Sequence, residues 1–399
     1  MGVAIGDVGR ITGDGIFDFF FNIYLPADHP INANTPKDFY PMPAYAAVDV
    51  FHLYHAPGNY VSAPSVQKVD LDQSTNVFPG GEFTFNCEAP RGAVLALPHG
   101  GHLEKLENLD PIREYAAQHA ESWYRYINGA RGRGLSNGSL YLATGREKSQ
   151  SWGMASFNSV REEFQVTYKP TPGAGSLHNY RWRGIHARRN PARDKTYDSG
   201  AEGSRNQTTF IHGLSISLGT GIWGRLFGNV EISPIVDVQL GNNKGDFTAS
   251  SSQGSPMFSW FFNFFGGRST TGGKHYGNSG DEIVISNFPP VSKIFNPAEV
   301  INQHLLHRTQ HANVVMSHDD DWCDILQDDG TSSVVQDPSE FLQRINDQFD
   351  VMDKYGATFL ISKCAPNIWD KNTAVQLGIG SRPRYTGGQG GRGGNAYGG

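Results

Sequence analysis

Cysteine is scarce in this sequence. The 399 residues contain three, Cys87, Cys323 and Cys364, and none lies in a C-x-x-C pair or at another spacing typical of a metal site. A count this low and odd argues against a disulfide-stabilised scaffold. It favours a reducing compartment, and we expect a cytoplasmic protein.

Basic excess and long apolar runs are also missing. The net charge is -6 with a pI of about 6.1, whereas a general nucleic-acid binder usually carries a strong basic excess. No stretch approaches the roughly 18 consecutive apolar residues of a membrane-spanning helix. The first residues, MGVAIGDVGR, show neither the basic nor the apolar region of a secretory signal. Composition therefore argues against nucleic acid as the partner and against a spanning helix.

Glycine and aromatic residues are abundant instead. Gly accounts for 48 residues and Phe, Tyr and Trp for 12% of the chain, which favours turns and strands over long helices. We predict an α+β fold, a β-rich mixed-sheet body with a few helices and a C-terminal α/β segment. The predicted divisions are a body over 1–240, a flexible Gly/Ser insertion over 241–280, an α/β segment over 281–380 and a disordered Gly-rich tail over 381–399.

Three helices have clear start signals, an Asp or Asn followed by Pro. They are expected to begin at Asp110, Asn296 and Asp337. The first should end near Asn128-Gly129, and the third is expected to carry Phe341, Ile345 and Phe349 on one face through 337–355. Residues 178–189 are predicted to form one long strand.

Three motifs resemble catalytic or nucleotide-binding signatures. LPHGGHLEKL (97–106) resembles an oxyanion loop, and G-L-S-N-G would make Ser136 a nucleophile, but a helix precedes that serine and a strand follows it, which is the wrong order for a nucleophile elbow. We therefore expect His99 and His102 to lie in a strand-to-helix loop. G-T-G-I-W-G (219–224) should be followed by a strand, so a Gly-rich hairpin or bulge is favoured over a dinucleotide site.

An acidic run, SHDDDWCDIL, follows the apolar strand expected at 312–316. Its carboxylates could bind a divalent cation at the end of the strand, and the candidate ligands are Asp319, Asp320, Asp321 and Asp324. The alternative is a helix N-terminus, in which Asp319 to Asp321 cap a short helix. We favour the cap, expect no cofactor, and keep a divalent cation as the alternative.

Arginines alternate with aromatic side chains near residue 180. On a strand, Tyr180 and Trp182 would face one way and the arginines the other, where they could bind an anion. The candidates are Arg181, Arg183, Arg188 and Arg189. A solvated strand face paired with acidic neighbours is the alternative.

The aromatic segment FSWFFNFF (258–265) lies between two Gly/Ser-rich stretches. On a helix its rings form one broad face, with only Ser259 and Asn263 opposite. The six rings are Phe258, Trp260, Phe261, Phe262, Phe264 and Phe265. At about 2–3 kcal/mol per fully buried ring, such a face favours burial in the chain's own core, in a protein partner or second copy, or at a membrane interface.

Several long phrases, among them GDVGRITGDGIFDFFFNIYLPADHPIN, WYRYINGARGRGL, NGSLYLATGREKSQSWGMASF and SHDDDWCDIL, resemble an abundant family of intracellular proteins from mushroom-forming fungi. The resemblance spans most of 4–365. It implies an intracellular location and supplies no activity, cofactor or site residue.

Together these patterns favour a non-enzymatic interaction or self-assembly protein that uses 258–265 as its contact element. One alternative is a metal- or phosphate-dependent enzyme that combines the acidic run with the arginines. Another is a membrane-active effector. The expected partner is a protein, a second copy included.

Overall fold

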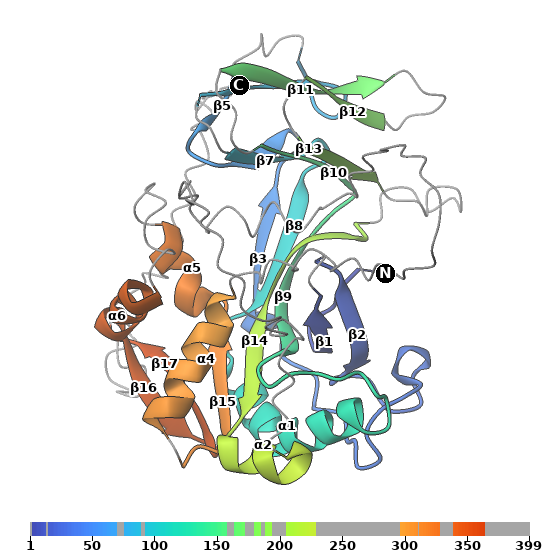
Figure 1. The fold of residues 1–399 in the computed structure, drawn as a ribbon. Coiled ribbons are helices and arrows are strands. Elements are labelled where there is room, and N and C mark those ends of the chain that lie inside the picture. Colours follow the sequence, from blue (N-terminus) through green and yellow to red (C-terminus); the bar gives the residue numbers. More distant parts are fainter. Residues whose placement is uncertain are drawn as a thin grey trace, which may run out of the picture.

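The computed structural model of the chain is drawn in Figure 1. It describes residues 2–12, 15–69, 76–88, 92–157, 163–171, 179–184, 188–193, 205–228, 296–309, 311–327 and 338–363. Within the described part, no helix is both long and apolar enough to cross a membrane.

A nine-stranded sheet forms the centre of the fold (Figure 1). Its main path is β16-β17-β15-β14-β9-β1-β2, and β8 pairs with β9 and β3 with β8. Every pair is antiparallel except β15 with β17, so the sheet is mixed. The strands are β1 (Asp7–Ile11), β2 (Phe17–Asn22), β3 (Val50–His55), β8 (Gly101–Leu106), β9 (Leu140–Ser149), β14 (Gln207–Leu218), β15 (Val314–His318), β16 (Phe349–Lys354) and β17 (Ala357–Ser362).

Helices cover both faces of this sheet. Successive side chains of β14 and β15 point to opposite sides, and apolar residues on each side pack against helices. Leu214, Ile216 and Met316 face α1 (Asp110–Asn128) and α2 (Thr220–Phe227). Val315 faces the other group, which consists of α4 (Pro297–Arg308), α5 (Asp320–Gln327) and α6 (Pro338–Gln348). The central strands are therefore buried on both sides, which explains why Val314–His318 is buried throughout.

Two four-stranded sheets pack face to face at one end of the molecule (Figure 1). Their shared core is aromatic and includes Phe83, Phe85, Tyr168 and Trp182. One sheet has the order β13-β10-β7-β4 and the other β12-β11-β6-β5. The strands are β4 (Asn59–Ser62), β5 (Val66–Lys68), β6 (Phe83–Cys87), β7 (Gly92–Leu97), β10 (Ser151–Phe157), β11 (Phe164–Thr171), β12 (Asn179–Arg183) and β13 (Arg188–Arg193). Two short 3-10 helices, η1 (Pro30–Asn32) and η2 (Ala47–Asp49), lie in the connection from β2 to β3.

The chain crosses between the large sheet and the sandwich at the HGGH motif. β7 belongs to the sandwich and β8 to the large sheet, and residues 98–100 join them as a tight turn. Gly100 has a φ of 71°, and a Cβ there would lie 2.1 Å from the carbonyl oxygen of His55, so the turn requires glycine. The predicted strand-to-helix loop is therefore wrong, because His102 lies on strand β8.

The α+β class is confirmed. The described elements after residue 296 do not form a separate sheet, since β15 pairs with β14 and extends the sheet of the body. Helix α1 begins at Asp110 and ends at Asn128, and α4 follows Asn296, as the start and stop signals predict.

Three local predictions are wrong, each because tertiary contacts override the local pattern. Residues 178–189 form no single long strand, since β12 and β13 belong to different sheets of the sandwich. Helix α6 ends at Gln348, and Phe349 begins strand β16 because it pairs with Ser362 of β17. G-T-G-I-W-G opens helix α2 instead of a hairpin, since Trp223 packs edge-on against Tyr124 with ring centroids 5.3 Å apart. The preceding strand, β14, has only antiparallel partners, so this helix is not part of a parallel dinucleotide-binding unit.

Tyr124 connects α1 to the sheet through a fully buried hydroxyl group. The hydroxyl donates to the carbonyl of Ile216 at 2.7 Å and accepts from the N–H groups of Gly138 at 2.9 Å and Leu140 at 3.3 Å. Three backbone groups on two strands and a turn thus depend on one side chain. Removing the hydroxyl leaves them buried without that partner.

We predict that Tyr124→Phe lowers the free energy of unfolding by about 1–3 kcal/mol, because buried backbone groups lose their hydrogen bonds. Chemical denaturation followed by circular dichroism measures this change. Tyr126→Phe on the same helix, where the side chain is partly exposed, is the matched control and should change stability little. Equal effects of the two substitutions would contradict the prediction.

Candidate functional site

The acidic turn that follows β15 lies where six elements meet. Strand β15 ends at His318, and residues 319–321 turn the chain into α5. Strand β14 lies beside β15 in the sheet, β9 lies beyond β14 and β8 pairs with β9, and α1 covers the adjacent face. The three carboxylates therefore enter a crowded, largely buried environment, and each finds different partners there.

Asp319 binds the neighbouring strands. Its Oδ2 accepts hydrogen bonds from the N–H of Gly213 at 3.0 Å and from the hydroxyl of Tyr141. Burial raises the pKa of Asp319 to about 6, although both donors act in the opposite direction. Burial, together with the adjacent Asp319 carboxylate, raises the pKa of Tyr141 well above its usual value, so Tyr141 remains a donor.

His318 is a buried neutral imidazole whose tautomer follows from its partners. Its Nδ1 accepts the N–H of Asp320 at 3.1 Å, so the proton is assigned to Nε2, which lies 2.7 Å from the hydroxyl oxygen of Thr144. Thr144 can in turn donate to the carbonyl of His212 at 3.3 Å. Burial lowers the pKa of His318 to about 3, consistent with an imidazole held in its neutral form.

Asp321 points back toward the strand. Its Oδ2 accepts the N–H of His318 at 2.7 Å, a contact that closes the turn at the start of α5. Burial raises the pKa of Asp321 to about 7, against the effects of that hydrogen bond and of the Arg113 guanidinium. Asp321 therefore stays protonated to a higher pH than an ordinary aspartate, since its pKa is raised to about 7.

Asp320 is the most solvent-exposed of the three carboxylates, with 43% of its side chain accessible. Lys105 Nζ lies 2.6 Å from Oδ2, and His212 Nδ1 lies 3.7 Å from Oδ1. Burial alone would raise the pKa of Asp320, but His212, His318 and Lys105 outweigh it and hold the pKa well below its usual range.

Helix α5 begins at Asp320 with Asp320 and Asp321 in its first turn, so the acidic run lies at a helix N-terminus. The Asp319 and Asp321 carboxylates accept from Gly213, Tyr141 and His318, which lie outside α5, so capping by these side chains stays a prediction. The three carboxylates contact three different sets of partners and do not converge on one point in the described structure. The side chain of Asp324 lies outside the described residues. A divalent cation at Asp319, Asp320, Asp321 and Asp324 accordingly stays a prediction.

The predicted anion-binding arginines lie in the sandwich. Arg181 and Arg183 are exposed on β12 and alternate with Trp182, which is 6% exposed, as the strand pattern predicts. Arg188 and Arg189 lie on β13, in the other sheet, and their side chains lie outside the described part. The described cationic partners of the acidic turn are Lys105 and Arg113, not these arginines. Anion binding at the four arginines stays a prediction, as does partner binding by 258–265, which lies outside the described residues.

Ser136 does not have the surroundings of a hydrolase nucleophile. It follows α1 and precedes β9, and its hydroxyl oxygen lies 2.6 Å from that of Ser139 in an exposed turn beside Arg10. His99, the other member of the hydrolase-like pattern, contacts Ser151 Oγ at 2.7 Å through Nδ1. The helix–serine–strand order predicted from the sequence is confirmed.

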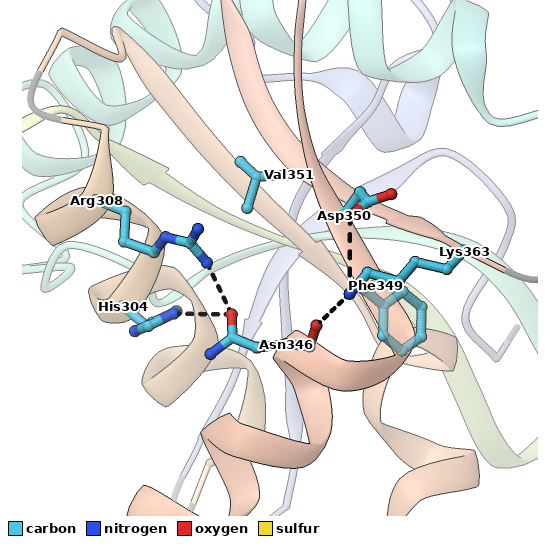
Figure 2. A pocket seen from close by; sticks show the side chains of 7 residues that line it. All are labelled: His304, Arg308, Asn346, Phe349, Asp350, Val351 and Lys363. Carbon is cyan, nitrogen blue, oxygen red and sulfur yellow. Dashed lines mark hydrogen bonds and ion pairs between the residues drawn. The ribbon is translucent and has the colours of Figure 1, made fainter.

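An open hollow lies between α4, α6 and β16 (Figure 2). It measures about 420 Å³, and the Asn346 side-chain oxygen at its rim accepts from Arg308 at 2.8 Å and from His304 at 3.3 Å. Lys363 donates to the backbone carbonyl of Asn346 at 2.6 Å and lies 3.8 Å from Asp350. The basic side chains of the hollow thus already donate hydrogen bonds to oxygen atoms of the protein. None of the residues that line the hollow belongs to the acidic turn.

Sequence reasoning did not single out two groups of titratable side chains. Glu147 on β9 is 7% exposed, its Oε1 lies 3.4 Å from His55 Nε2, and burial raises its pKa to about 7. On the opposite face of the sheet, His52 on β3 and His102 and Glu104 on β8 bring their ligand atoms within 4.8 Å of one another. The available signal was the two-residue spacing of His102 and Glu104, which puts both on one face of a strand. The contribution of His52 depends on strand pairing across 50 residues of sequence.

Comparison of the chain with known protein families, with curated proteins and with solved structures found no match. Any statement about function therefore depends on the residues themselves.

We predict that Asp321→Asn weakens the dependence of stability on pH. The folded-state pKa of about 7 lies above the ordinary value of 3.8, so the stabilising contribution of the protonated carboxyl is complete below pH 4 and is lost as the pH rises through 7. Asn keeps an oxygen that can accept from His318 and carries no charge. Relative to wild type, the variant should therefore gain on the order of 1–3 kcal/mol between pH 4 and pH 8.

Urea unfolding at several pH values measures this difference. Asp350→Asn is the matched control, because the Asp350 side chain is 63% exposed on β16, and it should follow wild type more closely. A variant at 321 whose stability follows the wild-type pH profile would show that the Asp321 carboxyl is not responsible.

Proposed function

We propose that the protein acts by binding a protein partner, a second copy of itself included, and that the aromatic segment 258–265 is its contact element. The observation that carries this proposal is the spacing of six aromatic residues in the sequence, which on a helix would form one apolar face with polar residues only at 259 and 263. A face of this kind in water favours association. Helix-in-groove docking on a partner uses the same spacing.

The geometry of the described part supports a binding function in two ways. The acidic turn, the sharpest sequence candidate for chemistry, has its buried carboxylates engaged in contacts that hold β15, β14 and β9 together. The hollow beside Asn346 and the one beside Ser136 are both open and lined by polar and charged side chains together with a few apolar ones. Small-molecule sites are more often enclosed and apolar.

We predict that Phe261→Ser/Phe262→Ser reduces the particle mass of the full chain, because the substitutions remove two adjacent rings from the apolar face. Light scattering coupled to size-exclusion chromatography measures this mass. Ser259→Ala/Asn263→Ser changes the opposite side of the segment and is the matched control, which should keep the wild-type mass. A wild-type mass equal to that of one chain, or a mass unchanged by the phenylalanine substitutions, would exclude self-association through this face.

An enzymatic function at the acidic turn is the second candidate. The observation that favours it is the grouping of half-exposed Asp320 with Lys105 and His212, near the buried carboxyl of Glu147. A pKa of about 7 suits Glu147 to general acid–base work at neutral pH. Because Lys105 Nζ already contacts Asp320 at 2.6 Å, a divalent cation would have to displace it.

For this second candidate we predict that Mg²⁺ or Mn²⁺ raises the thermal unfolding temperature of the wild-type chain, because a ligand that binds only the folded state stabilises it. Asp320→Asn should abolish the rise, whereas Asp350→Asn should keep it. The absence of any shift in wild type would contradict a cation-dependent site at this turn.

A further inference from the structure

His52, His102 and Glu104 lie together on one exposed face of two paired strands. In the β3–β8 ladder His52 is directly opposite Glu104, and His102 precedes Glu104 by two residues on β8, so all three side chains point to the same side. One nitrogen from each histidine and one carboxylate oxygen lie within 4.8 Å of one another. The strand register, which many backbone hydrogen bonds hold, therefore sets the grouping.

The distance between the two imidazoles matches a pair of metal ligands. His52 Nδ1 and His102 Nε2 are 3.1 Å apart. Two nitrogens bound to one metal at about 2.1 Å, with a bond angle between about 90° and 109°, lie roughly 3.0–3.4 Å apart. Small side-chain adjustments could thus place one ion between both rings and the carboxylate.

Neighbouring side chains hold two of the three groups in place. The ring of Tyr54 stacks on His102 with centroids 4.1 Å apart and an interplanar angle of 6°. Arg146 contacts Oε2 of Glu104 twice, through Nε at 2.9 Å and Nη2 at 2.8 Å. These contacts hold the carboxylate through Oε2. Outer partners of this kind are typical of protein metal sites.

We propose that His52, His102 and Glu104 form a binding site for a transition-metal dication, of which Zn²⁺ is the representative. Two imidazoles and one carboxylate suit zinc, cobalt or nickel, whereas Mg²⁺ and Ca²⁺ prefer sites made of oxygen ligands. Three protein ligands on an exposed face leave at least one coordination position for water or a substrate atom, the arrangement found in catalytic rather than structural zinc sites.

The surrounding charges set the expected strength of binding. Arg146 neutralises Glu104, and the guanidinium of Arg205 lies 5.8 Å from the centre of the Tyr54 ring. Both cations oppose a bound dication, so binding is expected to be reversible and weaker than in a thiolate site. The inference is independent of the aromatic segment and of the acidic turn, since it involves neither.

Cobalt and zinc titration of the full chain, prepared without a polyhistidine tag and stripped of metal, tests the site. Co²⁺ should give visible absorption bands at one equivalent, and Zn²⁺ should displace them, whereas Mg²⁺ and Ca²⁺ should not. His102→Gln and His52→Gln should each weaken binding about tenfold or more, because each removes one of three ligands. His311→Gln, at a side chain that is 78% exposed and remote in sequence, is the matched control and should bind like wild type.

Circular dichroism of each variant shows whether the fold is retained, and exposed His52 provides a second variant if His102→Gln fails to fold. A wild-type chain that shows no Co²⁺ bands and does not bind Zn²⁺ at millimolar concentration would overturn the proposal. So would folded His52→Gln and His102→Gln variants that bind as tightly as wild type. In either case the 3.1 Å contact is a hydrogen bond between the two imidazoles.

Discussion

The hydrogen bonds of Asp319 to β14 are the constraint on which the rest of the fold depends. The backbone N–H of Asp319 donates to the carbonyl of Gly213 at 3.1 Å, and its carboxylate accepts the N–H of the same glycine. One residue therefore satisfies both backbone groups of Gly213, where the ladder shows a bulge between His212 and Gly213. Without Asp319, the N–H and the carbonyl of Gly213 on β14 would lose these hydrogen bonds at an irregular point of the sheet.

The same turn determines where the C-terminal elements lie. Because Asp319 and His318 connect β15 to β14 and β9, strand β17 has a fixed edge to which it adds in parallel. Helices α4, α5 and α6 then cover that part of the sheet around Ile301, Ile325 and Phe341. Removing Asp319 or His318 leaves the hydrogen-bond partners of that residue buried and unsatisfied, so these two positions resist substitution for structural reasons. The buried members of the cluster therefore stabilise the fold, and Asp320 is the carboxylate of the turn that solvent reaches most.

The sequence was most informative where structure is decided locally. The Asp110-Pro111 start and the Asn128-Gly129 end of α1 are properties of a few adjacent residues, and both are confirmed. Helix α6 shows the limit, since Phe349 continues a helical pattern but pairs with Ser362, a contact that no local window contains. Helix α2 is the opposite case, a helix where the local pattern predicts none. The packing of Trp223 on Tyr124 of α1 stabilises this helix despite the glycines in its sequence.

The candidate sites also differ in whether their residues are adjacent in the sequence or are brought together by strand pairing. Asp319 to Asp321 are adjacent in sequence, so both their grouping and their role at a helix start could be predicted. His52 and His102 come together only through the pairing register of β3 with β8. Glu147 and His55 come together only because β8 pairs with both β3 and β9. A sequence shows that a histidine lies on a strand face, but only pairing shows what lies across from it.

The position of β14 in the sheet has a consequence for synthesis of the chain. Gln207–Leu218 pairs on one side with β9, which is already made, but its other edge waits for β15, which begins at Val314. At translation rates of about 5–20 residues per second, that edge remains open on the ribosome for on the order of ten seconds. An unpaired apolar edge in a central strand is a site of wrong strand pairing. Until β15 is made, the nascent chain can therefore aggregate through this edge of β14, which is paired in the folded protein.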